Sequence, residues 1–383
     1  MIWAGGTSVS PVSFWHVCIL ALHVAPETSA KRHRPVGQVA GVRSLATRDL
    51  RVPAQVPGSH GAAPRVARSR HKAVYNRLTV FNEELAMSPS SAVPRQHYVQ
   101  CFSPSGLHRI AYTEWGDADN PRVLVCVHGL TRSSRDFDRL AVALSDTYRV
   151  VCPDVAGRGL SSWLTDPRGY GVAQYVADIV TLIARTGVES VDWFGTSMGG
   201  LIGMALAGLP DAPIGRMVLN DVGPHIEPES LARIGEYVGR DERFPSLQAG
   251  IDQAARLAAS FGPLTADEWR EINTPLLHEV EGEWRFRYDP RIAEPFKAVT
   301  PEQAELGEQL LWRALAAFRG AVLVVRGEQS DLLSRETVAK MIEAGHDVSS
   351  VEIPGVGHAP AFLSAEQIAV ARRFLCEPAG DAS

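Results

Sequence analysis

The sequence lacks the patterns that identify several classes of protein. Its 383 residues include five cysteines, an odd number, and no Cys-x-x-Cys pair. We therefore expect neither a disulfide framework nor a structural zinc site. No segment approaches the roughly 18 uninterrupted apolar residues of a membrane span. No Gly-x-Gly-x-x-Gly follows a first strand, and no Gly-Lys-Ser/Thr ends a glycine-rich loop. Dinucleotide and phosphate-loop sites are therefore not expected, and neither a cofactor nor a metal is predicted.

Positive charge is scarce outside the N-terminal segment. Residues 1–86 hold 11 Lys and Arg against 4 Asp and Glu, a net charge of +7, whereas the remaining 297 residues hold 27 against 39, a net charge of −12. An acidic body does not suggest nucleic-acid binding. Hydrophobic content of 45% with 21% charged residues is typical of a globular domain. The unpatterned cysteines favour a reducing compartment, and we expect a cytoplasmic location.

The first part of the chain differs from the rest. Residues 31–72 are rich in Arg, Pro, Gly, Ser and Ala, and they cannot bury enough apolar surface to offset the entropy of the chain. The stretch 11–25 is similar to the apolar part of a signal peptide, but no Lys or Arg precedes it. An Arg-rich, acid-poor segment is also typical of a transit peptide. We expect residues 1–94 to be a disordered leader, and we hypothesise that the natural start lies near Met87.

From residue 95 onward, strand and helix patterns alternate. Strands are predicted at 97–102, 108–116, 122–129, 148–154, 190–195, 216–223, 321–327 and 348–355. The first two read as an antiparallel hairpin. Helical patterns fill most of the intervals, which predicts an α/β fold with a mostly parallel sheet covered on both faces. Residues 224–313 break the rhythm and contain helical stretches. We predict that they form a cap over one end of a core made of 95–223 and 314–383.

One strand–helix junction has an unusual composition. The strand 190–195 runs into Gly195-Thr196-Ser197-Met198-Gly199, and a helix of small residues follows. A turn this sharp requires glycines two positions on either side of its central residue. It would present the Ser197 hydroxyl at a helix N-terminus, where developing negative charge is stabilised. We predict that Ser197 is a nucleophile.

A serine nucleophile needs a base, and the base needs an orienting group. His358 follows the last predicted strand in a glycine-rich loop, and we expect it to be the base. Asp331 follows the preceding strand and is the favoured acid. Glu328 and Asp221 also follow strands, and Asp221 is the main alternative. With Asp331, the chain order is serine, acid, histidine.

An oxyanion intermediate also needs hydrogen-bond donors. We expect the backbone N–H of Met198, which directly follows the nucleophile, to be one of them. The second is expected from the loop after the strand 122–129, where Gly129 permits a tight backbone and the Leu130 N–H can point into the site. His128 is interpreted as structural. A third glycine-dense loop, 152–163, is expected to shape the carboxyl edge of the sheet, where ligands bind in open α/β sheets.

Taken together, these segments resemble the α/β-hydrolase fold family. The resemblance rests on "VHGLTR", "PDVAGRGLSSW", "GTSMGG", "RGEQSD" and "GVGHAP", in that order, and it spans about 97–376. It implies an eight-stranded, mostly parallel sheet with a cap inserted after the sixth strand, and a triad of Ser197, His358 and Asp331. The haloalkane dehalogenases and epoxide hydrolases of this fold use aspartate as nucleophile, so both are disfavoured. The loop "HGLTRSS" lacks the His-Gly-Gly-Gly run of one lipase group and points to the capped, small-substrate branch.

We therefore expect a cofactor-free serine hydrolase that acts on a small-molecule carboxylic ester (a carboxylesterase-like enzyme of EC 3.1.1) through an acyl-enzyme on Ser197. Short-chain esters, lactones and hydroxyalkanoate oligomers are compatible substrates. A C–C bond hydrolase of vinylogous diketone acids is the nearest alternative, followed by a thioesterase or an acyltransferase. A non-catalytic ligand receptor is disfavoured because the triad is intact.

Overall fold

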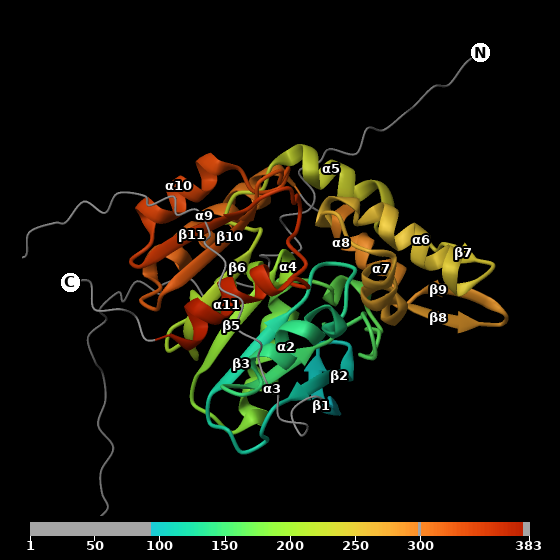
Figure 1. The fold of residues 1–383 in the computed structure, drawn as a ribbon, viewed down its shortest axis with the longest axis horizontal. Helices are drawn as coiled ribbons and strands as arrows, with labels where there is room; N and C mark the ends of the chain where they lie inside the picture. Colours follow the sequence, from blue (N-terminus) through green and yellow to red (C-terminus); the bar gives the residue numbers. More distant parts are fainter. Residues whose placement is uncertain (1–92, 298–299, 378–383) are drawn as a thin grey trace, which may run out of the picture. The chain divides into compact units, whose positions relative to one another are not determined.

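The computed structural model of the protein describes residues 93–297 and 300–377 (Figure 1). The expected leader, except for its last two residues, and the hypothesised start near Met87 lie outside the described residues. Within the described part of the chain, no helix is long and apolar enough to cross a membrane.

The core is an eight-stranded sheet in the order β1-β2-β4-β3-β5-β6-β10-β11. Its strands are β1 (Arg95–Ser103), β2 (Gly106–Trp115), β3 (Val123–Val127), β4 (Arg149–Pro153), β5 (Val191–Thr196), β6 (Ile214–Asn220), β10 (Val322–Gly327) and β11 (Val348–Ile353). The hairpin β1–β2 is antiparallel, and β2 also pairs antiparallel with β4. All the other pairs are parallel. The predicted eight-stranded, mostly parallel sheet is confirmed.

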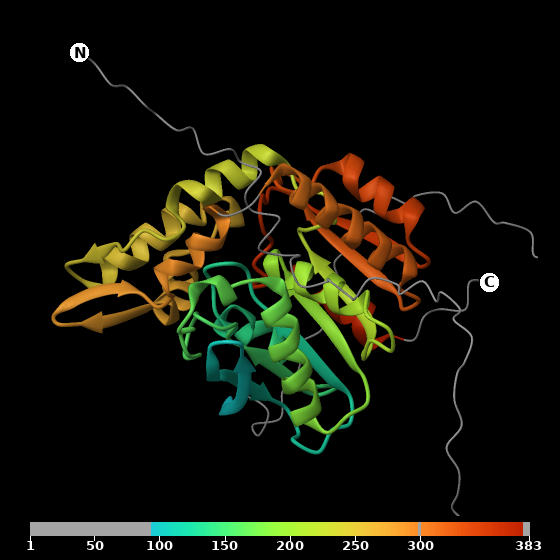
Figure 2. The same ribbon diagram turned by 180° about the vertical axis from the view of Figure 1, so that it is seen from behind.

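Helices cover both faces of this sheet (Figures 1 and 2). One face carries α3 (Val172–Thr186), α4 (Met198–Ala207), α9 (Pro301–Ala317) and α10 (Arg335–Ala344), and the other carries α2 (Asp138–Leu144) and α11 (Ala365–Cys376). Successive side chains of a strand point to opposite faces. In β3, Val125 therefore joins the cluster that contains Leu201 of α4, whereas Leu124 joins the cluster that contains Leu140 of α2. Full burial of each such side chain contributes roughly 1.5–3 kcal/mol.

A segment of different architecture follows β6, as expected for the cap. It contains α5 (Pro228–Tyr237), β7 (Arg243–Phe244), α6 (Leu247–Leu257), α7 (Ala266–Asn273), β8 (Leu277–Val280), β9 (Glu283–Phe286) and α8 (Glu294–Lys297). The expectation of a purely helical cap is corrected, because β7, β9 and β8 form a three-stranded antiparallel sheet. These strands have at most four residues each, too few for a period-2 pattern to stand out.

The end of the cap also differs from the expected position. The boundary expected at residue 313 falls inside α9. This helix packs on the core, since a Cβ added at Gly208, at the end of α4, would lie 2.7 Å from the Cβ of Ala314. We therefore propose that α9 belongs to the core and that the cap ends before it.

Candidate active site

Ser197 lies on a strained turn between β5 and α4. Its φ and ψ are 52° and −116°, a region that residues with a side chain rarely occupy. The two flanking glycines are required sterically. A Cβ at Gly199 would lie 1.9 Å from the Val127 carbonyl oxygen, and one at Gly195 would lie 2.4 Å from the Gly199 carbonyl oxygen. Only a residue without a side chain allows the strand and helix to approach this closely.

The serine hydroxyl begins a chain of hydrogen bonds. The Nε2 atom of His358, in the loop between β11 and α11, lies 3.0 Å from the Ser197 Oγ. The His358 Nδ1 atom lies 2.8 Å from Oδ2 of Asp221, the residue that directly follows β6. Asp221 is fully buried. Because an ionised carboxylate only accepts hydrogen bonds, the proton on this imidazole is held at Nδ1, and Nε2 is left to accept the serine proton.

Two further donors fix the Asp221 carboxylate. Its Oδ1 accepts from the Gly327 N–H at 2.8 Å, and its Oδ2 accepts from the Ser330 hydroxyl at 2.7 Å. Charge-assisted hydrogen bonds of this kind compensate for the loss of water around a buried anion. Ser330 carries no local sequence signal of this role, because its hydrogen bond joins two loops that are 109 residues apart in the chain.

Asp331 does not contact His358, and the favoured acid assignment is therefore corrected. Its carboxylate accepts from Nε and Nη2 of Arg233, on α5, at 2.9 and 3.0 Å, and its side chain is 47% exposed. Glu328, the other rival, accepts from the Gly355 N–H instead. Because β6 and β10 are parallel neighbours in the sheet, the loops that carry Asp221 and Asp331 both begin at the carboxyl ends of these strands. The loop after β10 then carries Asp331 outward and leaves Ser330 facing the triad.

The expected oxyanion loop lies beside Ser197. A Cβ added at Gly129 would lie 3.8 Å from the Ser197 Cβ. Leu130 lines the same cavity as Ser197. Met198 is the first residue of α4, so its N–H is one of the amides that a helix leaves without an intrahelical acceptor. Both residues therefore lie next to Ser197, and their roles as oxyanion donors stay predictions.

His128 is fully buried and sets the orientation of the Leu130 amide. Its Nε2 accepts from the Val155 N–H at 3.0 Å, so the proton is on Nδ1, which donates to the Gly129 carbonyl at 2.7 Å. In a trans peptide the carbonyl and the next N–H point in opposite directions. The Leu130 N–H is thus turned away from the imidazole. Burial, which outweighs the opposing effect of the hydrogen bond to the Gly129 carbonyl, lowers the pKa of His128 to about 3 together with the charges of Arg158 and Arg132, so the ring stays neutral.

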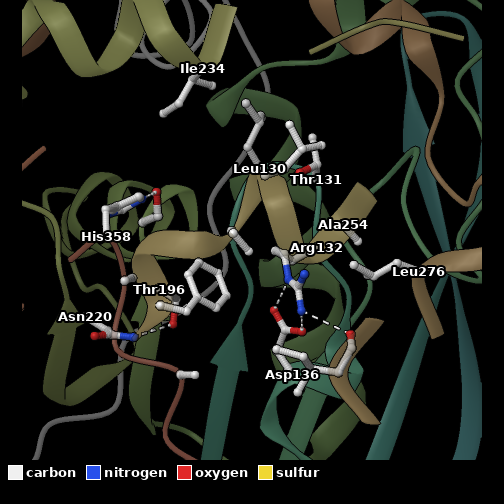
Figure 3. Close-up of a pocket in the computed structure, with 18 of the residues that line it drawn as sticks. Leu130, Thr131, Arg132, Asp136, Thr196, Asn220, Ile234, Ala254, Leu276 and His358 are labelled. Carbon is white, nitrogen blue, oxygen red and sulfur yellow. Dashed lines mark hydrogen bonds and ion pairs between the residues drawn. The ribbon is translucent and has the colours of Figure 1, made fainter. Parts of the chain in front are cut away.

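Ser197 and His358 line a cavity between the core and the cap. Figure 3 draws residues of this lining, among them His358, Leu130 and Arg132. The cavity walls are mainly apolar, and the cap contributes Ile234, Tyr237, Ala254, Leu257, Phe261, Leu276 and Phe286. Two arginines also line it, and each has a carboxylate partner: Arg132 pairs with Asp136, and Arg233 pairs with Asp331. These pairs leave the lining without an uncompensated guanidinium charge.

Arg132 also ties the oxyanion loop to the cap. Its guanidinium donates to the Asn273 Oδ1 at 2.9 Å and to the Ile272 carbonyl at 3.1 Å. It also forms an ion pair with Asp136 through two hydrogen bonds (Figure 3). All of these partners are partly or fully buried. The position of the cap over Ser197 is therefore coupled to the loop that carries the expected oxyanion donor.

One group of side chains in the described residues has the composition of a metal site. Cys101, His108 and Asp178 are buried, and one potential ligand atom of each lies within 4.8 Å of the others. They come from β1, β2 and α3, not from the loops that carry the triad. His108 Nε2 and Asp178 Oδ1 are already hydrogen-bonded at 3.0 Å, and Gln174 donates to the same carboxylate oxygen. Burial raises the pKa of Cys101 to about 12, so this thiol is not a thiolate at neutral pH.

Comparison with known proteins shows the family of this chain. Residues 124–372 match the model of the alpha/beta hydrolase family. The chain belongs to this family. A 3-hydroxybutyrate-oligomer hydrolase from Cupriavidus necator is 59% identical over 289 residues, which cover 74% of this chain and 99% of the relative. Esterase YbfF from Escherichia coli is 26% identical, over 62% of this chain and 87% of the esterase.

Solved structures of the family have the same fold. An alpha/beta hydrolase from Novosphingobium aromaticivorans superposes with a TM-score of 0.65 and is 37% identical, over 74% of this chain and 98% of that one. A putative hydrolase from Rickettsia typhi gives a TM-score of 0.66 at 27% identity, over 74% and 98%. Family and relatives together confirm the expected enzyme class: this alpha/beta hydrolase is an ester hydrolase.

Proposed function

We propose that the enzyme hydrolyses the ester bonds of short 3-hydroxybutyrate oligomers through an acyl-enzyme on Ser197. The observation that carries the proposal is the hydrogen-bonded chain Ser197–His358–Asp221 at the base of a mainly apolar cavity. The choice of oligomer is supported by the 59% identity to the Cupriavidus enzyme over nearly the whole of that protein.

The geometry supports an acyl-transfer mechanism. The Ser197 Oγ attacks the ester carbonyl carbon while His358 Nε2 takes its proton, and Asp221 stabilises the imidazolium. The Leu130 and Met198 amides hold the oxygen on which negative charge develops. When the tetrahedral intermediate collapses, the ester C–O bond breaks and His358 returns the proton to the leaving alkoxide. That group departs as the hydroxyl end of the shorter oligomer. Water then attacks the acyl-enzyme by the same steps and releases the acid.

The cavity suits the chain of such an oligomer. Each unit carries an ester and a methyl branch, and charge is confined to the terminal carboxylate. Because Arg132 and Arg233 are both paired with aspartates, the lining offers apolar contact along the chain and no strong site for a polyanion. The cap residues that line the cavity add to this apolar contact.

We also propose a reducing, cytoplasmic location. Cys101, Cys126, Cys152 and Cys376 are all free thiols, as expected where disulfides are not maintained.

The test uses the linear 3-hydroxybutyrate dimer and trimer, with p-nitrophenyl butyrate as a chromogenic reference. The wild-type enzyme should release monomer, and Ser197→Ala should reduce turnover to background without loss of the folded state. Ser349→Ala, at an exposed serine of β11, is the matched control and should retain full activity. A fluorophosphonate should label the wild type and the control but not Ser197→Ala.

Substrates of the alternative reactions are measured in the same series. Turnover of a vinylogous diketone acid or an acyl thioester, with none of the oligomers, would overturn the substrate assignment while leaving Ser197 in its role. Oligomer hydrolysis that persists in Ser197→Ala would overturn the mechanism.

A further inference from the structure

Arg158 is a buried cation in the loop that follows β4. Its exposed fraction is 1%. Among the described residues, the oxygen acceptors of its guanidinium are two backbone carbonyls and one tyrosine hydroxyl, and none of them is a carboxylate. A buried charge is costly unless it is paired or fully hydrogen-bonded. In place of a counter-ion, Arg158 has hydrogen bonds and two aromatic rings, with its Cζ 5.8 Å from the Tyr170 ring centroid and 5.2 Å from that of Tyr175. The surroundings of the guanidinium thus hold it in one place, and its contacts show which segments it joins.

The contacts of Arg158 reach both of the expected oxyanion residues. Its Nε donates to the Leu130 carbonyl at 2.8 Å, and its Nη2 lies 3.8 Å from the Met198 Sδ. Its Nη1 donates at 2.7 Å to both the Ala156 carbonyl and the Tyr175 hydroxyl. The planar guanidinium of Arg158 thus contacts both the loop after β3 and the first residue of α4.

The loop that carries Arg158 is itself tightly constrained. Gly157 has φ +82°, and a Cβ there would lie 2.6 Å from the Tyr170 ring. Gly159 has φ +52°, and a Cβ there would lie 2.2 Å from the Asp154 carboxylate. That carboxylate accepts from the Ser134 N–H, in the segment after the oxyanion loop, at 2.7 Å. The backbone on both sides of Arg158 is therefore fixed, and its hydrogen bonds hold the side chain in one orientation.

We propose that Arg158 is a positioning residue for the oxyanion hole, a role that rests on the proposed function. His128 anchors the carbonyl before the Leu130 N–H, and Arg158 anchors the carbonyl after it, so Leu130 is held on both sides. The Met198 side chain is held by the same guanidinium. The fixed positive charge also lies in a water-poor region close to where negative charge develops. Both effects favour the anionic transition state over the neutral ester, so they act on kcat.

The experiment compares Arg158→Met, Arg158→Lys and the control Tyr175→Phe. The first removes the charge and the donors, whereas the second keeps the charge but loses the planar fork. The control removes one acceptor of Arg158 and leaves the Leu130 and Met198 contacts in place. For p-nitrophenyl butyrate and the 3-hydroxybutyrate dimer, we measure kcat and KM, and we measure binding of a trifluoromethyl ketone that forms a tetrahedral adduct with serine.

We expect Arg158→Met to lower kcat by about 10- to 100-fold, less than the roughly 10²–10³-fold that follows removal of a donor itself, with KM changed by less than about threefold. Affinity for the ketone should fall by the same factor as kcat/KM, as required of a group that acts on the transition state. Arg158→Lys should lie between Arg158→Met and the wild type, and Tyr175→Phe should stay close to the wild type.

A kcat within twofold of wild type in both Arg158 variants would overturn the proposal. A rise in KM at unchanged kcat would also overturn it, because the residue would then act on substrate binding. If Arg158→Met does not fold, Arg158→Lys carries the test through its ketone affinity. Failure of the proposed function is seen separately, in the Ser197→Ala variant and in fluorophosphonate labelling of the wild type.

Discussion

Replacement of Asp221 by Asn tests the triad most sharply, because the change preserves shape and removes only charge. The carboxylate accepts from the Gly327 N–H, the Ser330 hydroxyl and the His358 Nδ1–H. In Asp221→Asn, the amide oxygen can still accept from Gly327. The NH₂ group then faces Ser330 and His358. The serine hydroxyl can turn to accept, so the fold should survive.

The imidazole can accept from the new NH₂ group only by releasing its proton from Nδ1. The proton then sits on Nε2, which faces the Ser197 Oγ at 3.0 Å and can no longer take the serine proton. The loss of the correct tautomer costs about 10⁴ in kcat in a serine triad, which corresponds to about 5.5 kcal/mol of transition-state stabilisation. We expect a loss of this size in oligomer hydrolysis and in the rate of fluorophosphonate labelling.

Asp331→Asn is the matched control. Its ion pair with Arg233 is roughly half exposed and contributes no more than about 1 kcal/mol to stability, so kcat should remain within about twofold. The two variants together refute our acid assignment if the larger loss follows the change at Asp331. A loss of less than tenfold in Asp221→Asn would refute the tautomer argument itself.

Two further predictions concern the residues that shape the site. Gly199→Ala should destabilise the fold by roughly 1–3 kcal/mol through overpacking and should abolish labelling of Ser197, because its Cβ would lie 1.9 Å from the Val127 carbonyl oxygen. Gly235→Ala in α5 is the control, because a Cβ there meets nothing within 4 Å; it should stabilise the fold by up to about 1 kcal/mol. Equal thermal unfolding temperatures in the two variants would contradict the steric argument. His128 has a folded pKa of about 3, below its unfolded value of 6.5, so the unfolded state binds the proton first as the pH falls. Stability from this group is complete above pH 6.5 and is lost progressively toward pH 3; it should fall by about 2 kcal/mol between pH 7.5 and 5.0. His128→Asn should lack this part of the slope in urea unfolding, and an unchanged slope would show that other groups cause the acid sensitivity.

The sheet and the sharp turn at Ser197 can both be predicted from the sequence, because each depends on residues that are close together in the chain. Continuous apolar runs mark strands that are buried on both faces, and such a run predicts β3, all of whose residues are buried. The position of Ser197 was likewise visible, since the steric demand of its turn requires glycine at 195 and 199. The position of His358 can also be predicted locally, because this residue follows the last strand in a glycine-rich loop.

The choice between Asp221 and Asp331 follows from the folded structure, in which His358 contacts Asp221. Both aspartates follow neighbouring strands, and their local sequences do not tell which one turns toward the histidine. Which aspartate contacts the histidine depends on the path of the loop after β10. In this loop, Asp331 pairs with Arg233 of the cap, and Ser330 donates a hydrogen bond to Asp221. The roles of His128 and Arg158 are of the same kind. Each acts through a hydrogen bond to a residue on another loop, and a contact between segments far apart in the chain leaves no mark in either segment alone.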